Sequence, residues 1–145
     1  MNTNNTIREY KFRGKRIDNG KWIYGSLITK TLSNEEHIFI LIEDSDFFRS
    51  LWELLIEVDP ETVGQYTEKK DKNGKEICDG DICKFNNPTV PVCVVRYFRD
   101  KACFGLSDEK NWFNLPFKEL VDNVEILGTI HDNPELLNSN NKSND

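Results

Sequence analysis

Histidine is scarce in this chain of 145 residues, and the sequence motifs of the common enzyme classes are missing. His37 and His131 are its only histidines, so acid–base and nucleophilic chemistry have few candidate residues. The dinucleotide fingerprint G-x-G-x-x-G, the phosphate loop G-x-x-x-x-G-K, the zinc motif H-E-x-x-H and the nucleophile elbow G-x-S-x-G do not occur. The sequence therefore indicates no catalytic residues and no cofactor, and it favours a protein that is not an enzyme.

Long apolar runs are missing as well. No run approaches the roughly 20 apolar residues that a membrane-spanning helix needs. The first residues, M-N-T-N-N-T, lack the apolar core of a signal peptide. We therefore expect a cytoplasmic protein with no membrane partner, and a disordered start over residues 1–6.

Basic charge is in deficit overall but not at the beginning of the chain. The net charge is −6, which argues against general coating of nucleic acids. Residues 1–30, however, hold seven Lys or Arg against Glu9 and Asp18, a local +5 that leaves −11 for the remainder. Such a basic edge can be a partner site, a contact between copies in an oligomer, or a solvated strand face. All three interpretations stay open.

Cysteine occurs without the C-x-x-C spacing of zinc sites. Its positions are Cys78, Cys83, Cys93 and Cys103. If Asp100-Lys101 is a two-residue hairpin loop, Cys103 faces Phe98 and lies roughly 17 Å along the strand from Cys93. That separation is too long for a shared ion or a disulfide. We expect no metal site, and we expect the thiols to be reduced and buried as small apolar side chains.

The clearest hairpin runs from Ile7 to Thr29, with a turn at Asp18-Asn19-Gly20-Lys21. Asn-Gly is the preferred centre of a type I′ turn, and this turn would pair Ile17 with Trp22, Lys15 with Tyr24 and Phe12 with Leu27. One face, with Tyr10, Phe12, Ile23 and Leu27, would then pack on a core. The opposite face would carry the candidate binding residues, which are Lys11, Arg13, Lys15, Trp22 and Tyr24.

This basic and aromatic face has two interpretations. Cations beside flat rings suit single-stranded nucleic acid, because a ring can stack on a base while the cations follow the backbone. The rings can equally be packed under another segment, with lysine stems covering them, in a structural or protein-contact role. The sequence alone does not decide between them.

The rest of the first half reads as further strands and one ambiguous segment. Ser33 to Glu36 is predicted to be a turn, followed by a strand from His37 to Glu43. Asp44-Ser45-Asp46 can cap a helical turn over residues 47–55, in which Phe47, Leu51, Trp52 and Leu55 form a helical stripe. A loop packed by aromatic side chains explains the same pattern. Residues 54–58 then look extended.

The stretch from Asp71 to Phe85 contains two predicted turns, Lys72-Asn73-Gly74 and Asp79-Gly80-Asp81. It also gathers carboxylates, at Asp71, Glu76, Asp79 and Asp81. We interpret these as solvated turn residues. The alternative is a metal-dependent hydrolytic or nuclease-like enzyme, because hard oxygen ligands suit Mg²⁺ or Mn²⁺.

Strands and short helical turns also fill the second half. Strands are predicted at 81–85, 91–99, 102–106 and 123–130, and helical turns at 116–121 and 133–137. The hairpin loop at Asp100-Lys101 would place Val95, Tyr97, Phe104 and Leu106 on one face, as the core of a small barrel. Trp112 and Phe113 lie within a polar segment to which we assign no element.

Several sequence blocks resemble one known family. They are K-F-R-G-K-R and G-K-W-I-Y-G near the start, V-D-P-E-T-V-G-Q-Y-T from Val58, D-K-N-G-K-E-I from Asp71, and I-L-G-T-I-H-D-N-P-E-L-L from Ile126. In this order they resemble the YopX family of phage and prophage proteins, over roughly residues 7 to 137. The resemblance implies an SH3-like β-barrel substructure and the cytoplasm of a bacterial host, but no activity.

Together these observations predict a mainly β protein with minor α. It would consist of a disordered start (1–6), a β-rich half with an N-terminal hairpin (7–66), an SH3-like barrel half ending in a short helical turn (67–137) and a disordered tail (138–145). As to function, they indicate a non-catalytic phage or prophage accessory protein that binds a macromolecule. The expected partner is another protein or a second copy of the chain, and a nucleic acid remains possible.

Overall fold

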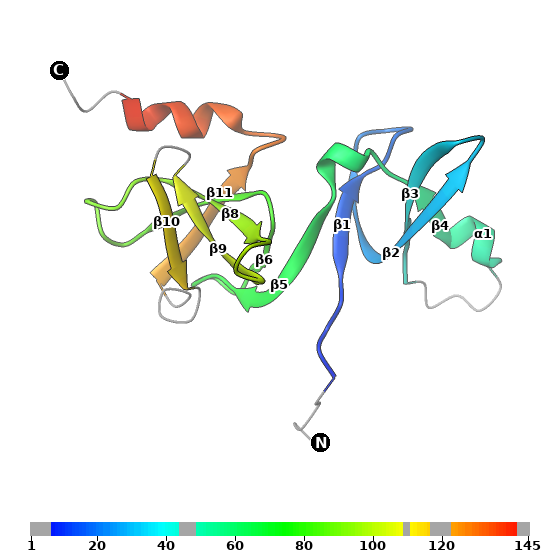
Figure 1. Ribbon diagram of the computed structural model, residues 1–145, viewed down its shortest axis with the longest axis horizontal. Coiled ribbons are helices and arrows are strands. Elements are labelled where there is room, and N and C mark those ends of the chain that lie inside the picture. Colours follow the sequence, from blue (N-terminus) through cyan, green and yellow to red (C-terminus); the bar gives the residue numbers. More distant parts are fainter. Residues whose placement is uncertain (1–6, 44–48, 109–110, 117–122, 142–145) are drawn as a thin grey trace. The chain divides into compact units, whose positions relative to one another are not determined.

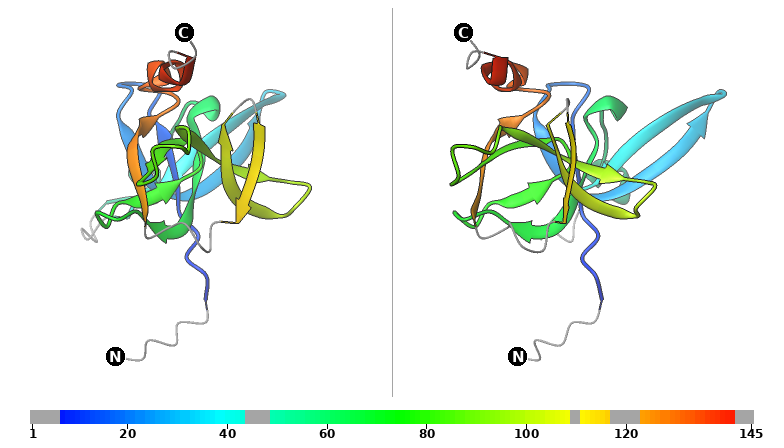
Figure 2. Two further views of the ribbon diagram at one scale, coloured as in Figure 1. Left: turned by 90° about the vertical axis from the view of Figure 1, so that its left-hand side faces the viewer. Right: turned by 60° about the vertical axis from the view of Figure 1, so that its left-hand side comes forward.

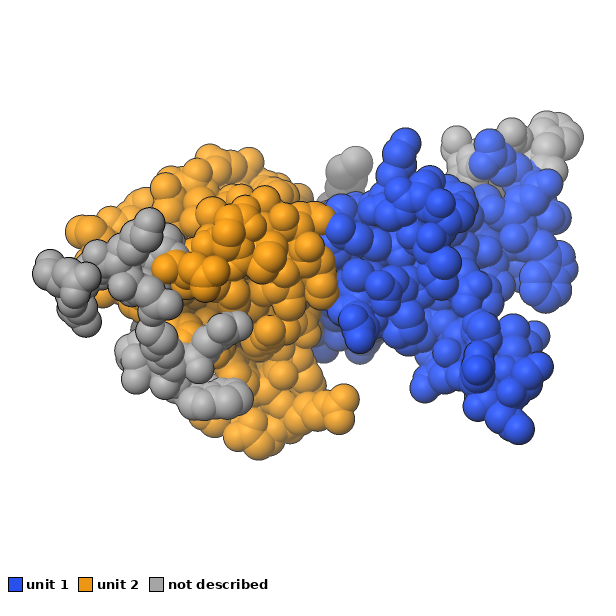
Figure 3. Space-filling view, turned by 90° about the horizontal axis from the view of Figure 1, so that it is seen from above, with its two compact units in different colours: residues 1–66 blue, residues 67–145 orange. Residues whose placement is uncertain are grey.

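The computed structural model describes residues 7–43, 49–108, 111–116 and 123–141 (Figure 1). The predicted mainly β class is confirmed, because two antiparallel sheets dominate and the helices are short. By its internal contacts the chain divides into two compact units, residues 1–66 and residues 67–145, coloured separately in Figure 3. No helix in the described ranges is long and apolar enough to cross a membrane. Residues 1–6 lie outside these ranges.

The first unit is built on one antiparallel sheet. Its strand order is β4-β3-β2-β1-β5. The strands are β1 (Phe12–Lys15), β2 (Trp22–Leu32), β3 (Glu35–Leu41), β4 (Leu55–Glu57) and β5 (Gly64–Lys70). The last strand crosses the boundary between the units and pairs with β6 at its far end in the sheet order.

The hairpin of β1 and β2 forms, but its predicted register is wrong by two residues. Lys15 faces Trp22 and Phe12 faces Gly25. The reason is the loop: Asn19 does not have the positive φ that a type I′ turn requires, and Gly20 alone takes one, at 68°. The loop is therefore longer than two residues. The Arg16 N–H donates to the Lys21 carbonyl oxygen at 3.0 Å, and residues 17–20 form the loop between them.

The two-residue type I′ turn lies instead at the next connection. Ser33 and Asn34 both have positive φ, 52° and 66°, and Leu32 faces Glu35 directly across the turn. The predicted turn and the strand after it are therefore found, but β3 begins at Glu35 and ends at Leu41, two residues earlier at each end than predicted. Figure 2 shows this second hairpin, in light blue, extending beyond the neighbouring strands of its unit.

The ambiguous segment contains a single helical turn, α1 (Leu51–Leu54). Its capping box is local: the Ser50 N–H donates to the Glu53 carboxylate at 3.1 Å. Phe47, at the start of the expected stripe, lies outside the described residues. In the described part of this segment only Leu51–Leu54 is helical, Leu55 begins β4, and Leu51 and Trp52 are exposed.

The core of the first unit is thin. Ile40 and Val58 are fully buried, and Gly14 packs against both, since a Cβ at Gly14 would lie 3.0 Å from Val58 and 3.3 Å from Ile40. A 3-10 turn, η1 (Pro60–Thr62), closes one end. There the Thr62 hydroxyl accepts from the Lys15 N–H at 2.8 Å and donates to a backbone carbonyl, so this buried polar group is satisfied.

The second unit contains a five-stranded antiparallel sheet in the order β10-β9-β8-β7-β11. The strands of this unit are β6 (Glu76–Cys78), β7 (Asp81–Phe85), β8 (Cys93–Phe98), β9 (Cys103–Asp108), β10 (Asn111–Pro116) and β11 (Val124–Thr129). Within the described residues this sheet is open, so the barrel closure that an SH3-like half implies is not found. The strand β10 was not predicted.

The β8–β9 hairpin has the predicted register, with Phe98 facing Cys103 and Val95 facing Leu106. Val95 and Leu106 are buried, as expected of a core face. Tyr97 is the exception: it contacts Phe104 at a centroid distance of 5.2 Å but remains 45% exposed. The core face therefore ends before Tyr97.

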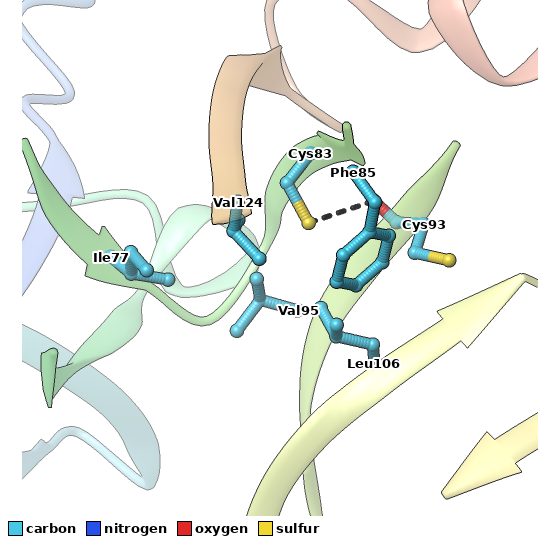
Figure 4. Close-up of a cluster of buried hydrophobic side chains, with 7 residues drawn as sticks. All are labelled: Ile77, Cys83, Phe85, Cys93, Val95, Leu106 and Val124. Carbon is cyan, nitrogen blue, oxygen red and sulfur yellow. Dashed lines mark hydrogen bonds between the residues drawn. The ribbon is translucent and has the colours of Figure 1, made fainter. Parts of the chain in front are cut away.

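A dense apolar cluster fills the second unit (Figure 4). It consists of Ile77, Cys83, Phe85, Cys93, Val95, Leu106 and Val124. Strands β6, β7, β8, β9 and β11 all contribute to it, so the cluster joins segments far apart in sequence. Burial of this apolar area is the main source of stability in the unit.

The segment that follows β11 forms a turn that hydrogen bonds hold in place. The Thr129 hydroxyl accepts from the N–H groups of His131 and Asp132, at 3.2 and 3.0 Å, and the Ile130 N–H donates to the Gly80 carbonyl oxygen at 3.0 Å. The predicted helical turn follows as a 3-10 helix, η4 (Pro134–Asn141), which continues past its expected end at residue 137. Residues 117–121 of the other expected helical turn lie outside the described ranges, and Pro116 belongs to β10.

Candidate interaction surfaces

The sequence-predicted binding residues do meet on one face of the first unit. A register error of two residues leaves the face of every side chain unchanged, because the side-chain period of a strand is two. Lys15 faces Trp22, and Arg13 faces Tyr24. The guanidinium carbon of Arg13 lies 4.8 Å from the ring centroid of Trp22, and the Lys15 Nζ lies 5.4 Å from it. Both contacts have cation–π geometry.

These cations are engaged within the fold. Arg13 is only 4% exposed, and Trp22 is half-buried. Lys11 lies over the ring of Tyr66, with its Nζ 4.8 Å from the centroid, and forms an ion pair with Glu9 at 3.2 Å. A ring already covered by cations has less surface for a nucleic-acid base. The geometry thus favours a structural role for Arg13 and Trp22 over base stacking.

The carboxylate of Asp71 organises the central turn. Its Oδ1 accepts from the N–H groups of Asn73 and Lys75, each at 2.9 Å, and its Oδ2 accepts from the Ile126 N–H at 3.1 Å. Burial raises the pKa of Asp71, but the three N–H donors, together with the charge of Lys75, outweigh burial and hold the pKa below its usual value. Asp71 is therefore a buried structural acceptor, and our interpretation of it as a solvated turn residue is wrong.

Asp81 has a similar place at the second turn. It is fully buried, and its Oδ2 accepts from the Cys78 N–H at 2.8 Å, which fixes the turn around Gly80. Asp79 and Glu76 are partly buried. In the part of the chain that the structure describes, no group of three or more His, Cys, Asp or Glu side chains is arranged to hold a metal ion.

The cysteines are reduced, and three of them are buried. Cys83 and Cys93 face each other directly between β7 and β8, a pairing that the sequence did not reveal. Burial raises the pKa of the Cys93 thiol to about 11, and it raises that of Cys83 further. Such thiols are poor nucleophiles. Cys103 is exposed, so the expectation of burial is wrong there, because this residue opens β9 beside the hairpin loop.

His37 has a local partner. Its Nδ1 lies 2.6 Å from the Glu57 carboxylate on the neighbouring part of the sheet, and its ring stacks near Phe39 at 6.4 Å. No cysteine or serine nucleophile belongs to this pair in the interactions of the described residues. His37 thus links β3 to β4, as expected of a structural histidine.

Among the described residues of the first unit, the most exposed aromatic side chain was not predicted as a candidate site. Trp52 is 75% exposed and Leu51, beside it on α1, is 61% exposed. The signal was present in the sequence, because Ser50 and Glu53 have capping-box spacing and limit the helix to a start at Leu51. A helix of one turn is too short for the helical stripe that the sequence suggested.

Comparison with known proteins identifies the family of the chain. A family model described as YopX protein matches residues 11–138. No curated protein matches the chain. Among solved structures, the crystal structure of protein EF1440 from Enterococcus faecalis is similar, with a TM-score of 0.51 and 23% sequence identity over 90% of this chain and 99% of that chain. At this identity the likeness concerns the fold alone. Because the family model covers most of its length, the chain belongs to the YopX family.

Proposed function

We propose that this chain is a non-catalytic accessory protein of a phage or prophage, and that it acts by binding another protein through the exposed side chains of α1. The observation that carries the proposal is the exposure of Trp52 and Leu51 side by side. Tryptophan is enriched among the residues that dominate binding energy in protein interfaces. An exposed tryptophan beside an exposed leucine supplies the apolar centre that such an interface needs.

A protein partner is favoured over a nucleic acid by charge and by burial. The whole chain carries −6, and Arg13, which a nucleic acid would need, is buried. The residues of α1 include Glu53 and no Lys or Arg. A phosphate backbone requires cations at the contact, whereas an apolar protein surface does not.

The metal-dependent enzyme is supported by no specific observation. Two carboxylates of the acidic stretch, Asp71 and Asp81, accept backbone N–H groups in the described structure. Such hydrogen bonds use oxygen lone pairs that a metal ion would need. We therefore assign a structural role to Asp71 and Asp81.

Binding to one purified partner tests the proposal. The partner is isolated by affinity capture from bacteria that carry the prophage, and is then titrated against the wild type and the Leu51→Ser/Trp52→Ser double variant. We expect the double variant to lose at least about 2 kcal/mol of binding free energy, the range of a binding hot spot. The matched control is Tyr97→Ser, since Tyr97 is an exposed aromatic of the other unit. Unchanged binding of the double variant would refute the proposal.

Two further measurements distinguish the other classes of function. Labelled single-stranded DNA is titrated at low salt against the wild type and the Arg13→Glu/Lys15→Glu variant. Tight binding lost in this variant would replace the protein partner with a nucleic acid. Multiple-turnover hydrolysis that depends on Mg²⁺ and is abolished by Asp79→Asn would replace binding with catalysis. The proposal expects neither result.

A further inference from the structure

The distal part of β2 has an open backbone edge. β1 pairs with β2 from Trp22 to Gly25, and β3 pairs with it from Ser26 to Leu32. Among the described residues, β3 is the only strand that pairs with the segment Ser26–Leu32, which we call the open edge. A row of backbone N–H and C=O groups without a strand partner is a template for pairing with another strand.

The hydrogen bonds of the sheet show which residues of the open edge point outward. The Ile38 carbonyl oxygen of β3 accepts from the Val58 N–H at 3.0 Å, so the backbone groups of Ile38 point away from β2. Ile38 faces Thr29, and in an antiparallel pair both members then point their groups away from each other. Thr29 therefore directs its N–H and C=O to the open edge. Because the backbone groups of successive strand residues point alternately to the two sides, Leu27 and Thr31 also direct their N–H and C=O groups to the open edge.

Two other strand edges in the described residues, those of β4 and β11, are short or covered. β4, the edge strand on the far side of β3, has three residues. On β11, the Ile126 N–H donates to Asp71 and the Val124 carbonyl oxygen accepts from the Lys72 N–H at 2.9 Å. Covering an edge in this way prevents unwanted pairing. The open edge has no such cover among the described residues.

We propose that the open edge pairs antiparallel with the same edge of a second copy of this chain, about a two-fold axis at Thr29. A two-fold axis perpendicular to the sheet maps each face of the sheet onto itself. Two residues that face each other across the axis must therefore have side chains on the same face, so their residue numbers are both odd or both even. With the axis at Thr29, Thr29 faces its own counterpart, Leu27 faces Thr31 and Ile28 faces Lys30. All outward N–H and C=O groups of Leu27, Thr29 and Thr31 then have partners.

This register is better than its two neighbours. An axis at Lys30 would place two ammonium groups opposite each other and leave the outward groups of Leu27 facing the turn. An axis at Ile28 would direct Thr31 onto Gly25, which already pairs with Phe12 of β1. Only the axis at Thr29 pairs the whole open edge while avoiding both conflicts. It also forms a Thr–Thr pair across the strands, which is favourable.

Charge supports a second copy as the partner. In the proposed dimer, the tip of each β2–β3 hairpin would lie beside the start of β1 in the other copy. This tip contains the exposed residues Glu35 and Glu36. The first thirty residues, which include β1, have a net charge of +5, and the segment from residue 31 to residue 66 has a net charge of −8. Because of the two-fold symmetry, the acidic segment of each copy would lie beside the basic segment of the other, so this favourable contact occurs twice in the dimer. The contact lies on β2 and is separate from Leu51 and Trp52.

Charge reversal at the axis tests the register directly. Analytical ultracentrifugation is carried out over a concentration series with the full chain, with Thr29→Glu, with Thr29→Lys and with an equimolar mixture of the two variants. We expect a wild-type dimer, a dissociation constant raised about tenfold or more in each single variant, and recovery of the dimer in the mixture. The recovery requires position 29 to face position 29. It also shows that both variants are folded.

Each other outcome overturns the inference. A wild type that stays monomeric throughout removes the dimer, and single variants that dimerise like the wild type move it away from Thr29. A mixture no better than the single variants contradicts the register, once circular dichroism shows both to be folded. Binding of a different protein at Leu51 and Trp52 is unaffected by these variants, so the two proposals fail separately.

Discussion

The two units of this chain differ in how many of their apolar residues are buried. In the described residues of the second unit, a cluster from Ile77 to Val124 joins five strands in one buried core. In the described residues of the first unit, the fully buried apolar side chains are Ile40 and Val58, while Tyr24, Leu51 and Trp52 are exposed. A sheet that leaves large apolar side chains and a strand edge in solvent is suited to binding. This difference is the basis of our proposals, in which the second unit supplies stability and the first supplies contacts.

The largest expected effect is in the core of the second unit. Leu106→Ala removes buried side-chain atoms from a residue that is 1% exposed, and it leaves a cavity between Val95 and its neighbours. We expect a loss of about 2–5 kcal/mol in the free energy of unfolding. Urea denaturation measures it. A loss below about 1 kcal/mol would show that this core is less tightly packed than the comparison requires.

Gly25→Ala is expected to damage the first unit alone. A Cβ at Gly25 would collide with the Leu41 carbonyl oxygen, and backbone cannot move aside as a flexible side chain can. We expect a cost of about 1–3 kcal/mol from overpacking. Hydrogen exchange should show faster exchange in β2 and β3 than in β8 and β9. Gly74→Ala is the comparison variant without a steric clash. No atom lies within 4 Å of a Cβ at this position, so only the positive φ of Gly74 opposes the substitution.

Asp71→Asn should change the dependence of stability on pH. The folded pKa of Asp71 lies below the unfolded one, so its carboxylate stabilises the fold above the unfolded pKa, and this stabilisation is lost as pH falls through the folded pKa. At neutral pH we expect the variant to lose about 1–3 kcal/mol, because an amide cannot accept all three N–H groups. The difference should shrink in urea titrations below about pH 4. A difference independent of pH would contradict the role of this carboxylate.

The smallest effect on stability is expected at α1. Trp52→Ser changes a side chain that is 75% exposed, so the free energy of unfolding should change by no more than about 0.5 kcal/mol. The same substitution is expected to impair partner binding. If Trp52→Ser instead unfolded the first unit, Trp52 would be part of its core. The contrast with Leu106 would then fail.

Sequence reasoning succeeded where local signals dominate. The strand predicted from His37 is found as β3, shifted by two residues, because its β-branched and aromatic residues favour a strand. The turns at Gly74 and Gly80 form where glycine can adopt a positive φ. The face of Trp22 and Tyr24 was also correct, because a slip of two residues preserves the alternation of side chains.

It failed where distant parts of the chain decide. The loop at Asn19-Gly20 is longer than its dipeptide suggests, and its length sets the register of β1. Nothing local indicates that Asp71 accepts from Ile126, or that Cys83 faces Cys93. The open edge of β2 depends on where β1 ends. These are properties of tertiary contacts.

Hydrogen exchange at two protein concentrations tests the contrast between the units most directly. The amides of Leu27, Thr29 and Thr31 should gain protection as the concentration rises, because pairing between copies would engage them. The amides of Val94 and Val95, in the core of the second unit, should be protected equally at both concentrations. If the open edge of β2 exchanges at the same rate at low and high concentration, the first unit does not use this edge for contacts, and the account is contradicted.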